Sequence, residues 1–431
     1  MIGFDPIPYF ALSDVGLRRS HNQDAYSVIL AKGRKAWYEQ GHFFIIADGM
    51  GGHAVGEKAS QKAARDIPLT FLKHAPDGVG NALRRAFVET NIAINAIGQN
   101  NKEFQGLGTT ASALVVRPEG AWIAHVGDSR IYRIRGDVIQ QLTFDHSYVW
   151  EMARRQGVDP DEIEGVKANV IVRSLGPDAL VQVDVEGPHP LEHGDIFVIC
   201  SDGLSGPVTD SEIGAIVRTL PPEEAARFLV HLANLRGGPD NITVIVIHAE
   251  DAKMAAGPTA SRWEGLRRMH WSLPVLSGGV LLIVVALLAA LGSKPVGLLL
   301  FLLAAMTIGT GLVGLILNLR AERQRRQIEP VTEELHVYRE APCDVDETVV
   351  ERLARGIDEL QRKVHESFPK LVPETYGPLY ARGEELFKQK NFAEAFREFC
   401  RAMNELARSY NSIRAKSEMF QPVWDKRKKK A

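Results

Sequence analysis

The chain has little cysteine and no excess of charge of either sign. Its three cysteines, Cys200, Cys343 and Cys400, lie far apart among 431 residues, so they support neither a disulfide framework nor a zinc site. We therefore expect the bulk of the chain in a reducing compartment. Lys and Arg number 51 and Asp and Glu 53, a net charge of −2 that argues against nucleic acid as a partner.

A secretory signal is also missing from the start, because Met1–Asp14 has neither a basic segment nor an apolar core. The composition is not that of a disordered chain. Hydrophobic residues make up 45% and charged residues 24%, as in proteins that bury a core. The length predicts two or three domains.

Two long runs contain no charged residue, Trp271–Leu291 and Val296–Leu319. Each is long enough to cross a bilayer as a helix, and the alternative, a pair of buried core helices, normally shows a polar edge that is missing here. The short connection between them predicts a hairpin. Ala305 and Gly309 form a small-residue pair at which the helices are expected to approach.

Basic residues flank this hairpin on both sides: Arg262, Arg267 and Arg268 before it, and Arg320, Arg323, Arg325 and Arg326 after it. The positive-inside rule then places both flanks in the cytoplasm. Because neither run carries an ionisable residue, we interpret the hairpin as an anchor and not as a transport pathway. The expected location is the plasma membrane, crossed twice, with the rest of the chain cytoplasmic.

The hairpin divides the chain into successive parts. The predicted parts are a soluble region (1–250), a linker with a basic flank (251–270), the hairpin (271–319), a basic and polar linker (320–345) and a helical region (346–431).

The soluble region alternates short β-branched runs with longer periodic stretches. The runs predict strands over Phe43–Ala47, Thr110–Val116, Ala121–Val126, Ile131–Arg135, Asp195–Cys200 and Thr243–His248. The periodic stretches predict helices over Val55–Lys73, Asn81–Ile97, Ser211–Arg218 and Glu223–Leu235. Strands joined by tight turns favour an α+β fold with antiparallel sheets and helices on their faces.

Four aspartates stand beside a glycine or at the edge of one of these strands: Asp48, Asp128, Asp202 and Asp240. A single Asp-Gly pair is usually a turn. Four together, if the strands share a sheet edge, bring carboxylates to one place, where they repel one another unless a cation lies between them. Oxygen ligands alone favour Mg²⁺ or Mn²⁺ over Zn²⁺.

Seven segments of this region occur in an order and at a spacing typical of one family. They are Ser13-Asp14-Val15-Gly16 with Arg19-Ser20-His21-Asn22-Gln23-Asp24, Asp48-Gly49-Met50-Gly51-Gly52, Gly108-Thr109-Thr110, Val126-Gly127-Asp128-Ser129-Arg130, Thr143-Phe144-Asp145-His146, Ser201-Asp202-Gly203-Leu204 and Gly238-Pro239-Asp240-Asn241-Ile242-Thr243. On these segments the stretch from Met1 to about Glu250 resembles a metal-dependent protein serine/threonine phosphatase of the 2C type, in its bacterial form. The resemblance implies a sandwich of two antiparallel β-sheets flanked by α-helices, with a binuclear metal centre at one end.

The resemblance also implies a role for each matching residue. Asp48 would bridge two Mn²⁺ or Mg²⁺ ions, the Gly49 carbonyl would bind one of them, and Asp202 and Asp240 would hold the other. Asp24 would act through metal-bound water, and Asp128 with Asp202 would bind a third, weaker ion. Arg19 would bind the substrate phosphate, a task that suits the paired donors of a guanidinium.

The implied reaction is hydrolysis of phosphoserine or phosphothreonine by a hydroxide that bridges the metals. Two positions depart from part of the family. Met50 stands where some members have a histidine proposed as the general acid, and Gln23 replaces a glutamate. The segment His146–Ala168 corresponds to a variable flap beside the site. Cys200, inside an apolar run, is interpreted as a buried thiol and not as a nucleophile.

The helical region is predicted to be a surface for a protein partner. Asp346–Glu366 has helical spacing of its apolar residues, and Leu379–Ala402 resembles one tetratricopeptide helix pair. One such pair is too few for a solenoid, so a small helical bundle with this pattern by chance is the alternative. Lys426–Lys430 is a basic tail, either solvated or attracted to anionic lipid.

The sequence thus predicts a membrane-anchored phosphatase that acts on phosphoproteins, opposes a Ser/Thr protein kinase and carries a surface for a protein partner. One alternative is a pseudophosphatase that serves as a membrane-tethered scaffold, against which the retention of Asp48, Asp202, Asp240 and Arg19 argues. Another is that the hairpin and tail form a sensor that controls the phosphatase.

Overall fold

The computed structural model describes residues 7–51, 56–75, 78–104, 106–163, 165–166, 170–249, 272–326, 335–367 and 373–419. Within them, two six-stranded sheets are formed entirely of antiparallel pairs. The first sheet has the spatial order β1 (Tyr9–Asp14), β11 (Ile242–His248), β10 (Ile196–Cys200), β7 (Arg130–Arg135), β8 (Val138–Gln141) and β12 (Arg339–Pro342).

The second sheet has the order β2 (Asp24–Ile29), β3 (His42–Met50), β5 (Ala111–Arg117), β6 (Gly120–Val126) and β9 (Asp184–His189), with β4 (Gly108–Thr109) paired to β3. Phe44 and Leu114 of this sheet share an apolar cluster with Phe197 and Ile245 of the first. The two sheets therefore pack face to face, and the predicted antiparallel sandwich is confirmed.

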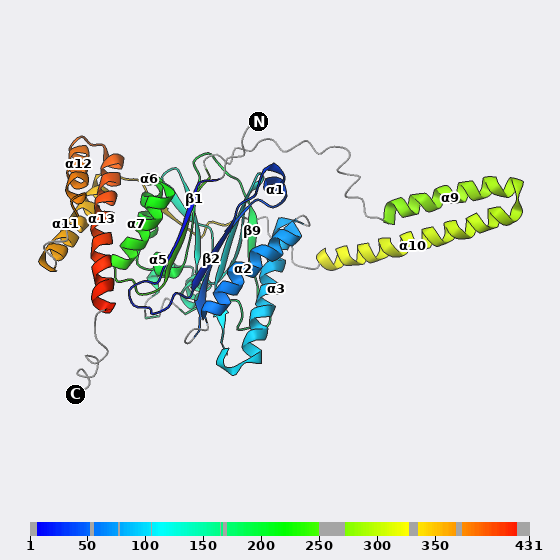
Figure 1. The fold of residues 1–431 in the computed structure, drawn as a ribbon, viewed down its shortest axis with the longest axis horizontal. Helices are drawn as coiled ribbons and strands as arrows, with labels where there is room; N and C mark the ends of the chain where they lie inside the picture. Colours follow the sequence, from blue (N-terminus) through cyan, green and yellow to red (C-terminus); the bar gives the residue numbers. More distant parts are fainter. Residues whose placement is uncertain are drawn as a thin grey trace. The chain divides into compact units, whose positions relative to one another are not determined.

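Helices cover the outer face of each sheet (Figure 1). The second sheet is covered by α2 (Gly56–His74) and α3 (Val79–Asn100), and Phe71 of α2 packs on Phe43 with ring centroids 5.1 Å apart. The first is covered by α6 (Asp210–Thr219) and α7 (Pro222–Leu235). Shorter helices are α1 (Arg34–Glu39), α4 (Tyr148–Gln156), α5 (Asp202–Ser205) and the 3₁₀ turns η3 (Lys102–Phe104) and η4 (Pro160–Glu162).

The described residues that follow the apolar helices, 335–367 and 373–419, are called the tail below. The tail belongs to the same compact unit as residues 7–249. Its strand β12 extends the first sheet at β8, and its helices are α11 (Glu347–Ser367), α12 (Tyr376–Lys388) and α13 (Phe392–Met419). Phe396 and Met403 of α13 share one apolar cluster with Phe228 of α7. The sequence predicted these helices, but not that they pack on the phosphatase-like region.

Ion pairs and hydrogen bonds reinforce this packing. Arg401 of α13 binds Glu224 of α7 at 2.8 Å, and Arg397 donates to the backbone oxygen of Thr219 at 3.0 Å. Both partners belong to the helices that cover the first sheet. The tail is thus bound to the sandwich through a strand and through a helix at once.

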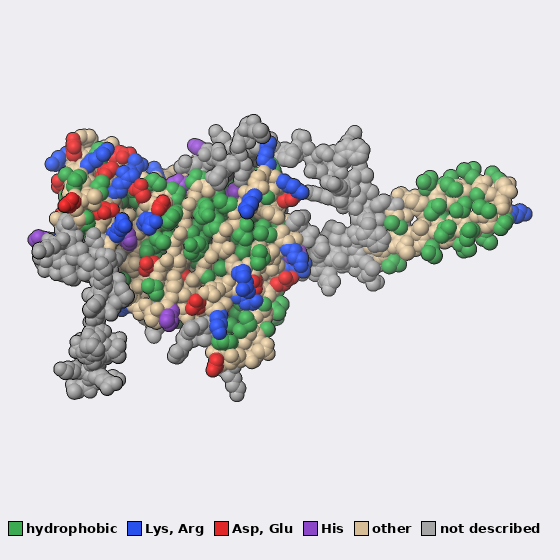
Figure 2. All heavy atoms as spheres, in the orientation of Figure 1, with side chains coloured by type: hydrophobic (Ala, Val, Ile, Leu, Met, Phe, Trp, Pro, Cys, Tyr) green, Lys and Arg blue, Asp and Glu red, His purple; other side chains and the backbone are tan. Residues whose placement is uncertain are grey.

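The second unit holds two apolar helices, α9 (Ser272–Gly292) and α10 (Lys294–Arg326). Within α10, Lys294–Leu315 has a mean hydropathy of 2.3 and is the described segment that is long and apolar enough to cross a membrane. The apolar stretch of α9, Ser277–Gly292, is shorter. Large apolar side chains such as Leu288 and Leu299 are exposed, and Figure 2 shows apolar atoms over the surface of both helices.

The contact between α9 and α10 lies on another face than the sequence predicted. Ala305 and Gly309 are exposed, and a Cβ added at Gly309 would meet nothing within 4 Å. The close approach is instead at Gly279, where an added Cβ would lie 2.6 Å from the Ile308 side chain. A helix that is apolar all round gives no pattern from which the packed face can be predicted.

Most predicted elements agree with the structure to within a few residues. The unpredicted elements are β1, β2, β4, β8, β9, β12, α1, α4, α5 and the 3₁₀ turns η3 and η4. The linker 251–270 and the basic tail Lys426–Lys430 lie outside the described residues.

Candidate active site

Three carboxylates come from the second sheet and its turns. Asp48 lies near the end of β3, and Asp24 is the first residue of β2, directly opposite Asp48 in the strand pairing. Asp128 lies in the turn between β6 and β7. Because β2 and β3 are antiparallel, the start of one and the end of the other meet at the same edge.

Two more carboxylates come from the first sheet. Asp202 is the first residue of α5, directly after β10, and Asp240 lies just before β11, the neighbour of β10. Gly203 packs so closely on the backbone of Asn241 that a side chain at Gly203 would collide with it. This contact places the residues that follow Asp202 against those that follow Asp240.

Asp24 joins the two sheets at this edge. Its Oδ2 accepts hydrogen bonds from Ser201 Oγ at 2.8 Å and from Thr243 Oγ1 at 2.6 Å, both on the first sheet. The side chain is buried. The predicted site residues of both sheets are therefore brought together across the sandwich.

The electrostatics of the carboxylates reflect this crowding. Burial raises the pKa of Asp48 well above its usual value, and the charges of Asp24, Asp202, Asp128 and Asp240 raise it further. Burial, followed by the charge of Asp202, raises the pKa of Asp128 to about 8. Buried carboxyl groups so close together cannot all be ionised unless a cation binds between them.

Asp24 and Asp202 show the same effect. Burial raises the pKa of Asp24 to about 6, although hydrogen bonds from Thr243 and Ser201 oppose the shift. Burial, and then the charge of Asp240, raises the pKa of Asp202.

Three of these side chains have a buried oxygen without a hydrogen-bond partner: Oδ1 of Asp24, of Asp128 and of Asp202. Buried carboxylate oxygens without donors are costly in a protein interior, and a divalent cation would satisfy them. Among the described residues, no three His, Cys, Asp or Glu side chains are already arranged as a complete metal site. The donor set nevertheless fits an oxygen-ligated cation.

Arg19 lies in the loop between β1 and β2 and reaches the site from solvent. Its guanidinium donates to Asp240 Oδ2 at 2.6 Å, and its side chain is 50% exposed. The hydrogen bond with Asp240 and the nearby carboxylates raise the pKa of Arg19, so it is a permanent cation. The structure thus pairs Arg19 with one of the predicted metal ligands.

Asn241 fixes the loop that carries Arg19. Its Nδ2 donates to the backbone oxygens of Val15 at 2.9 Å and His21 at 3.0 Å, and its Oδ1 accepts from the Gln23 N–H at 2.8 Å. Asn241 is buried. The sequence analysis assigned it no role, although it is part of a quoted segment.

Gly49, the predicted backbone ligand, belongs to β3 and packs against Gly56, the first residue of α2. Its N–H donates to the Gln23 oxygen at 3.1 Å, and a side chain at Gly49 would collide with the backbone of Gly56. Only glycine allows this close approach of β3 and α2.

The chain matches the family model "Protein phosphatase 2C" over residues 11–162. It is 37% identical over 250 residues to the protein phosphatase PhpP of Streptococcus pneumoniae, covering 98% of that protein and 56% of this chain. The serine/threonine phosphatase stp of Listeria monocytogenes is 34% identical over 247 residues, with 94% and 55% covered. A solved structure, the catalytic domain of the phosphatase PstP in complex with two manganese ions, is 32% identical with a TM-score of 0.46, covering 98% of that chain and 56% of this one.

The chain belongs to the protein phosphatase 2C family. It is a protein serine/threonine phosphatase, as the resemblance of the sequence implied. Because the match covers nearly all of PhpP but little more than half of this chain, much of this 2C-type phosphatase has no counterpart in that relative.

The structure assigns a supporting role to two threonines of a motif that the sequence analysis quoted without a role. Thr110 Oγ1 accepts the Asp48 N–H at 2.9 Å and lies 2.7 Å from Ser129 Oγ. Thr109 Oγ1 donates to the Asp48 backbone oxygen at 2.9 Å. In this 2C-type phosphatase the two threonines therefore fix the backbone of Asp48.

Two buried histidines lie behind Asp128. His125 and His146 stack with ring centroids 4.8 Å apart, and His146 Nδ1 accepts the Gly127 N–H at 2.9 Å. Burial lowers the pKa of His125 to about 3, so its ring is neutral. Cys200 is buried in β10 with a pKa raised by burial to about 12, as expected for a thiol without a catalytic role.

Proposed function

We propose that this phosphatase hydrolyses phosphoserine and phosphothreonine in proteins with two Mn²⁺ or Mg²⁺ ions and opposes a Ser/Thr protein kinase. The observation that carries the metal requirement is the set of buried carboxylates at one edge of the sandwich, three of them with an unpaired oxygen. The retained carboxylates favour this function over the scaffold alternative.

Asp48, Asp202, Asp240 and the Gly49 carbonyl would hold the two ions, with Asp24 in support. Asp128 with Asp202 would hold a third, weaker ion. When bound, the ions supply charge that neutralises the phosphate and lowers the pKa of a water molecule. The protein side chains hold and orient, since phosphoryl transfer needs little covalent chemistry from them.

Arg19 would bind and orient the substrate phosphate. Its guanidinium is half exposed at the rim, so an incoming phosphate can reach it. Asp240 holds it there and, once its charge is shared with a cation, leaves the guanidinium donors to the phosphate oxygens. Met50 cannot donate a proton to the leaving group, so we expect a water molecule to do so.

The test is hydrolysis of a phosphothreonine peptide by the full chain in detergent, with Mn²⁺, with Mg²⁺ and with chelator. We expect turnover that requires the metal and falls at least 100-fold in Asp240→Asn. Asp66→Asn, a carboxylate on the surface of α2 that pairs with Lys62, is the matched control and should keep full activity. Metal-independent turnover, or full activity in Asp240→Asn, would contradict the proposal.

We also propose that α9 and α10 anchor the chain by crossing the plasma membrane twice, with the phosphatase in the cytoplasm. Apolar side chains cover both helices, and exposing them to water would be costly. The test is extraction of the cell membrane with alkaline carbonate and digestion of intact cells with protease. Release by carbonate, or cleavage of the phosphatase from outside, would contradict the anchor.

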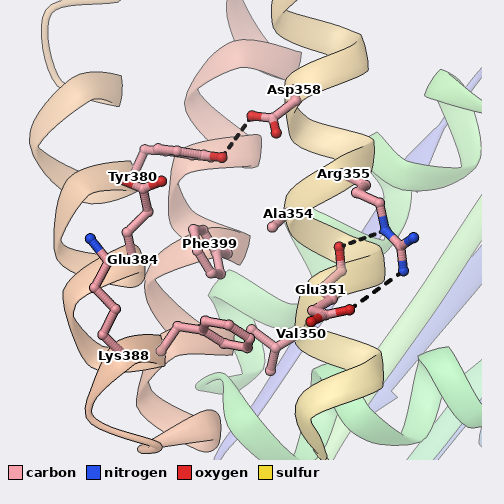
Figure 3. Close-up of a pocket in the computed structure, with 10 residues that line it drawn as sticks. Val350, Glu351, Ala354, Arg355, Asp358, Tyr380, Glu384, Lys388 and Phe399 are labelled. Atoms are coloured by element: carbon pink, nitrogen blue, oxygen red, sulfur yellow. Dashed lines mark hydrogen bonds and ion pairs between the residues drawn. The ribbon is translucent and has the colours of Figure 1, made fainter.

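The tail offers a surface for a protein partner, which we place in the groove between α11 and α12. The groove, of about 310 Å³, is lined by Phe387 and other residues. Figure 3 shows Tyr380, Glu384 and Lys388 of α12 and Phe399 of α13 on one side of it, facing Val350 and Ala354 of α11. The tetratricopeptide resemblance of these helices stays a prediction. A photo-crosslinking residue at Glu384 should trap the partner in cells, whereas one at Glu347, outside the groove, should not.

A further inference from the structure

The flap, His146–Ala168, is attached at its start to the backbone beside Asp128. The His146 N–H donates to the Gly127 oxygen at 2.7 Å, and the Gly127 N–H donates to His146 Nδ1 at 2.9 Å. Gly127 directly precedes Asp128 in the chain. A movement at the start of the flap would therefore shift the backbone that carries Asp128.

The chain that leaves the flap is attached beside Asp48. Leu175 and Thr109 exchange both of their backbone hydrogen bonds, at 2.9 and 3.0 Å, and Thr109 in turn donates to the Asp48 oxygen. The start of the flap and the chain at Leu175, seven residues after it, are thus both hydrogen-bonded to backbone that adjoins site residues.

The tip of the flap is held by the tail. Arg339, the first residue of β12, forms ion pairs with Asp161, at 2.5 Å, and Asp159, at 3.5 Å, which lie in and just before η4. The Arg339 side chain is 22% exposed, whereas that of Asp161 is 74% exposed. The arginine side chain is thus mostly covered by the tail and the sandwich, whereas the aspartate at the flap tip is open to solvent.

Arg339 is itself held rigidly through its neighbour Tyr338. The Tyr338 N–H donates to the Gln141 oxygen at 2.9 Å, and its hydroxyl donates to the buried Glu186 at 2.8 Å. The Tyr338 ring packs on Phe144, two residues before the flap, with centroids 5.7 Å apart. The tail therefore presents Arg339 to the flap from a fixed strand.

We infer that Arg339 is a positioning residue that holds the flap in the conformation that accepts phosphoprotein substrates. The inference rests on the proposed function. A small phosphate ester occupies only the carboxylate edge, whereas a polypeptide extends beyond its phosphate and contacts the flap. An exposed ion pair contributes little to overall stability, so its loss should change the flap and leave the fold intact.

The experiment compares Arg339→Ala with wild type in the full chain in detergent with Mn²⁺. KM for a phosphothreonine peptide of about a dozen residues should rise ~2–5-fold, the change expected from the loss of an exposed ion pair. Its kcat, and the hydrolysis of p-nitrophenyl phosphate, should stay within about twofold. Amide hydrogen exchange over α4 and η4 should become several-fold faster. Arg339→Lys should retain much of the effect of arginine, and Arg339→Glu combined with Asp161→Arg should restore the KM.

The matched control is Arg355→Ala, which removes an exposed arginine of the tail that pairs with Glu351 and does not touch the flap. Unchanged hydrogen exchange in the flap of Arg339→Ala, or an equal loss toward both substrates, would overturn the inference. If wild type hydrolyses neither substrate with Mn²⁺, the proposed function fails, and hydrogen exchange still decides whether Arg339 holds the flap.

Discussion

A Cβ atom added at Gly214 of α6 would lie 2.5 Å from the Cβ of Cys343 in the tail. Cys343 follows β12 directly, and its side chain is buried. Glycine at this position of α6 therefore makes room for the tail, and the contact is a sensitive point of the junction between the tail and the sandwich.

Gly214→Ala should lower the free energy of unfolding by about 1–3 kcal/mol, because the added methyl group collides with a packed side chain. Gly356→Ala in α11 is the matched control, since a Cβ there would meet nothing within 4 Å. It should stabilise the chain by about 0.5–1 kcal/mol through helix propensity. Chemical denaturation measures both, and equal effects of the two substitutions would contradict the described junction.

The three thiols should not react with Ellman's reagent in the native chain. All are buried, and burial raises the pKa of Cys343 to about 11 and that of Cys200 to about 12. The thiolate is the reactive form, so labelling requires opening of the structure. In Gly214→Ala one thiol, Cys343, should become reactive first, as mass spectrometry of the labelled peptides would show. Rapid labelling of wild type would refute the prediction.

His42 should make the protein less stable in mild acid. Burial lowers its pKa to about 4, and its Nδ1 accepts the Ala31 N–H at 3.0 Å, which requires a neutral nitrogen. The unfolded ring binds a proton near pH 6.5, so the contribution of His42 is complete above that pH and is lost as the pH falls toward 4. Between pH 6.5 and 5 the loss is about 1.5 kcal/mol.

In His42→Gln, which cannot take up a proton, the fall in unfolding free energy between pH 6.5 and 5 should be smaller by that amount. Denaturation curves at several pH values measure it. Parallel pH profiles for wild type and variant would show that His42 is not the responsible group.

Asn241→Asp should impair both activity and stability. Aspartate has the same shape but cannot donate to Val15 and His21, so the loop that carries Arg19 loses its attachment. We expect kcat/KM for a phosphopeptide to fall at least tenfold and the unfolding free energy to fall by about 2–3 kcal/mol. Asn404→Asp, whose side chain faces His231 at the contact of α13 and α7, should keep activity within about twofold. Full activity in Asn241→Asp would contradict this role.

Local patterns in the sequence predicted antiparallel sheets with helices on their faces, and aspartates at the ends of strands. The two-sheet sandwich and the role of each site residue were predicted from the family resemblance. Strand runs such as Phe43–Ala47 are marked by β-branched and aromatic residues, and the aspartates that follow them come to one edge once the strands pair. Segments with weaker patterns were missed. β2 begins with Asp24 and alternates exposure only partly, and β12 is four residues long.

The tail shows what local patterns leave undetermined. The apolar spacing of α11 and α13 predicted helices with a buried face, but such a face fits any apolar partner equally well. Which partner it meets depends on shape, as at Gly214, and on single pairs such as Arg401 with Glu224. Such pairs join residues that are far apart in the chain, and the spacing of apolar residues along a helix cannot predict them.

The edge position of β12 makes its pairing a late step in the assembly of this protein. Gln140 of β8 and Glu340 of β12 are hydrogen-bonded partners 200 positions apart, and both apolar helices lie between them in the chain. During synthesis the first sheet is left with an open strand until α10 has been translated. Closing so long a loop is slow compared with pairing of neighbouring strands. Nascent phosphatase therefore acquires its last strand, and with it the hold of Arg339 on the flap, only after the apolar helices have emerged from the ribosome.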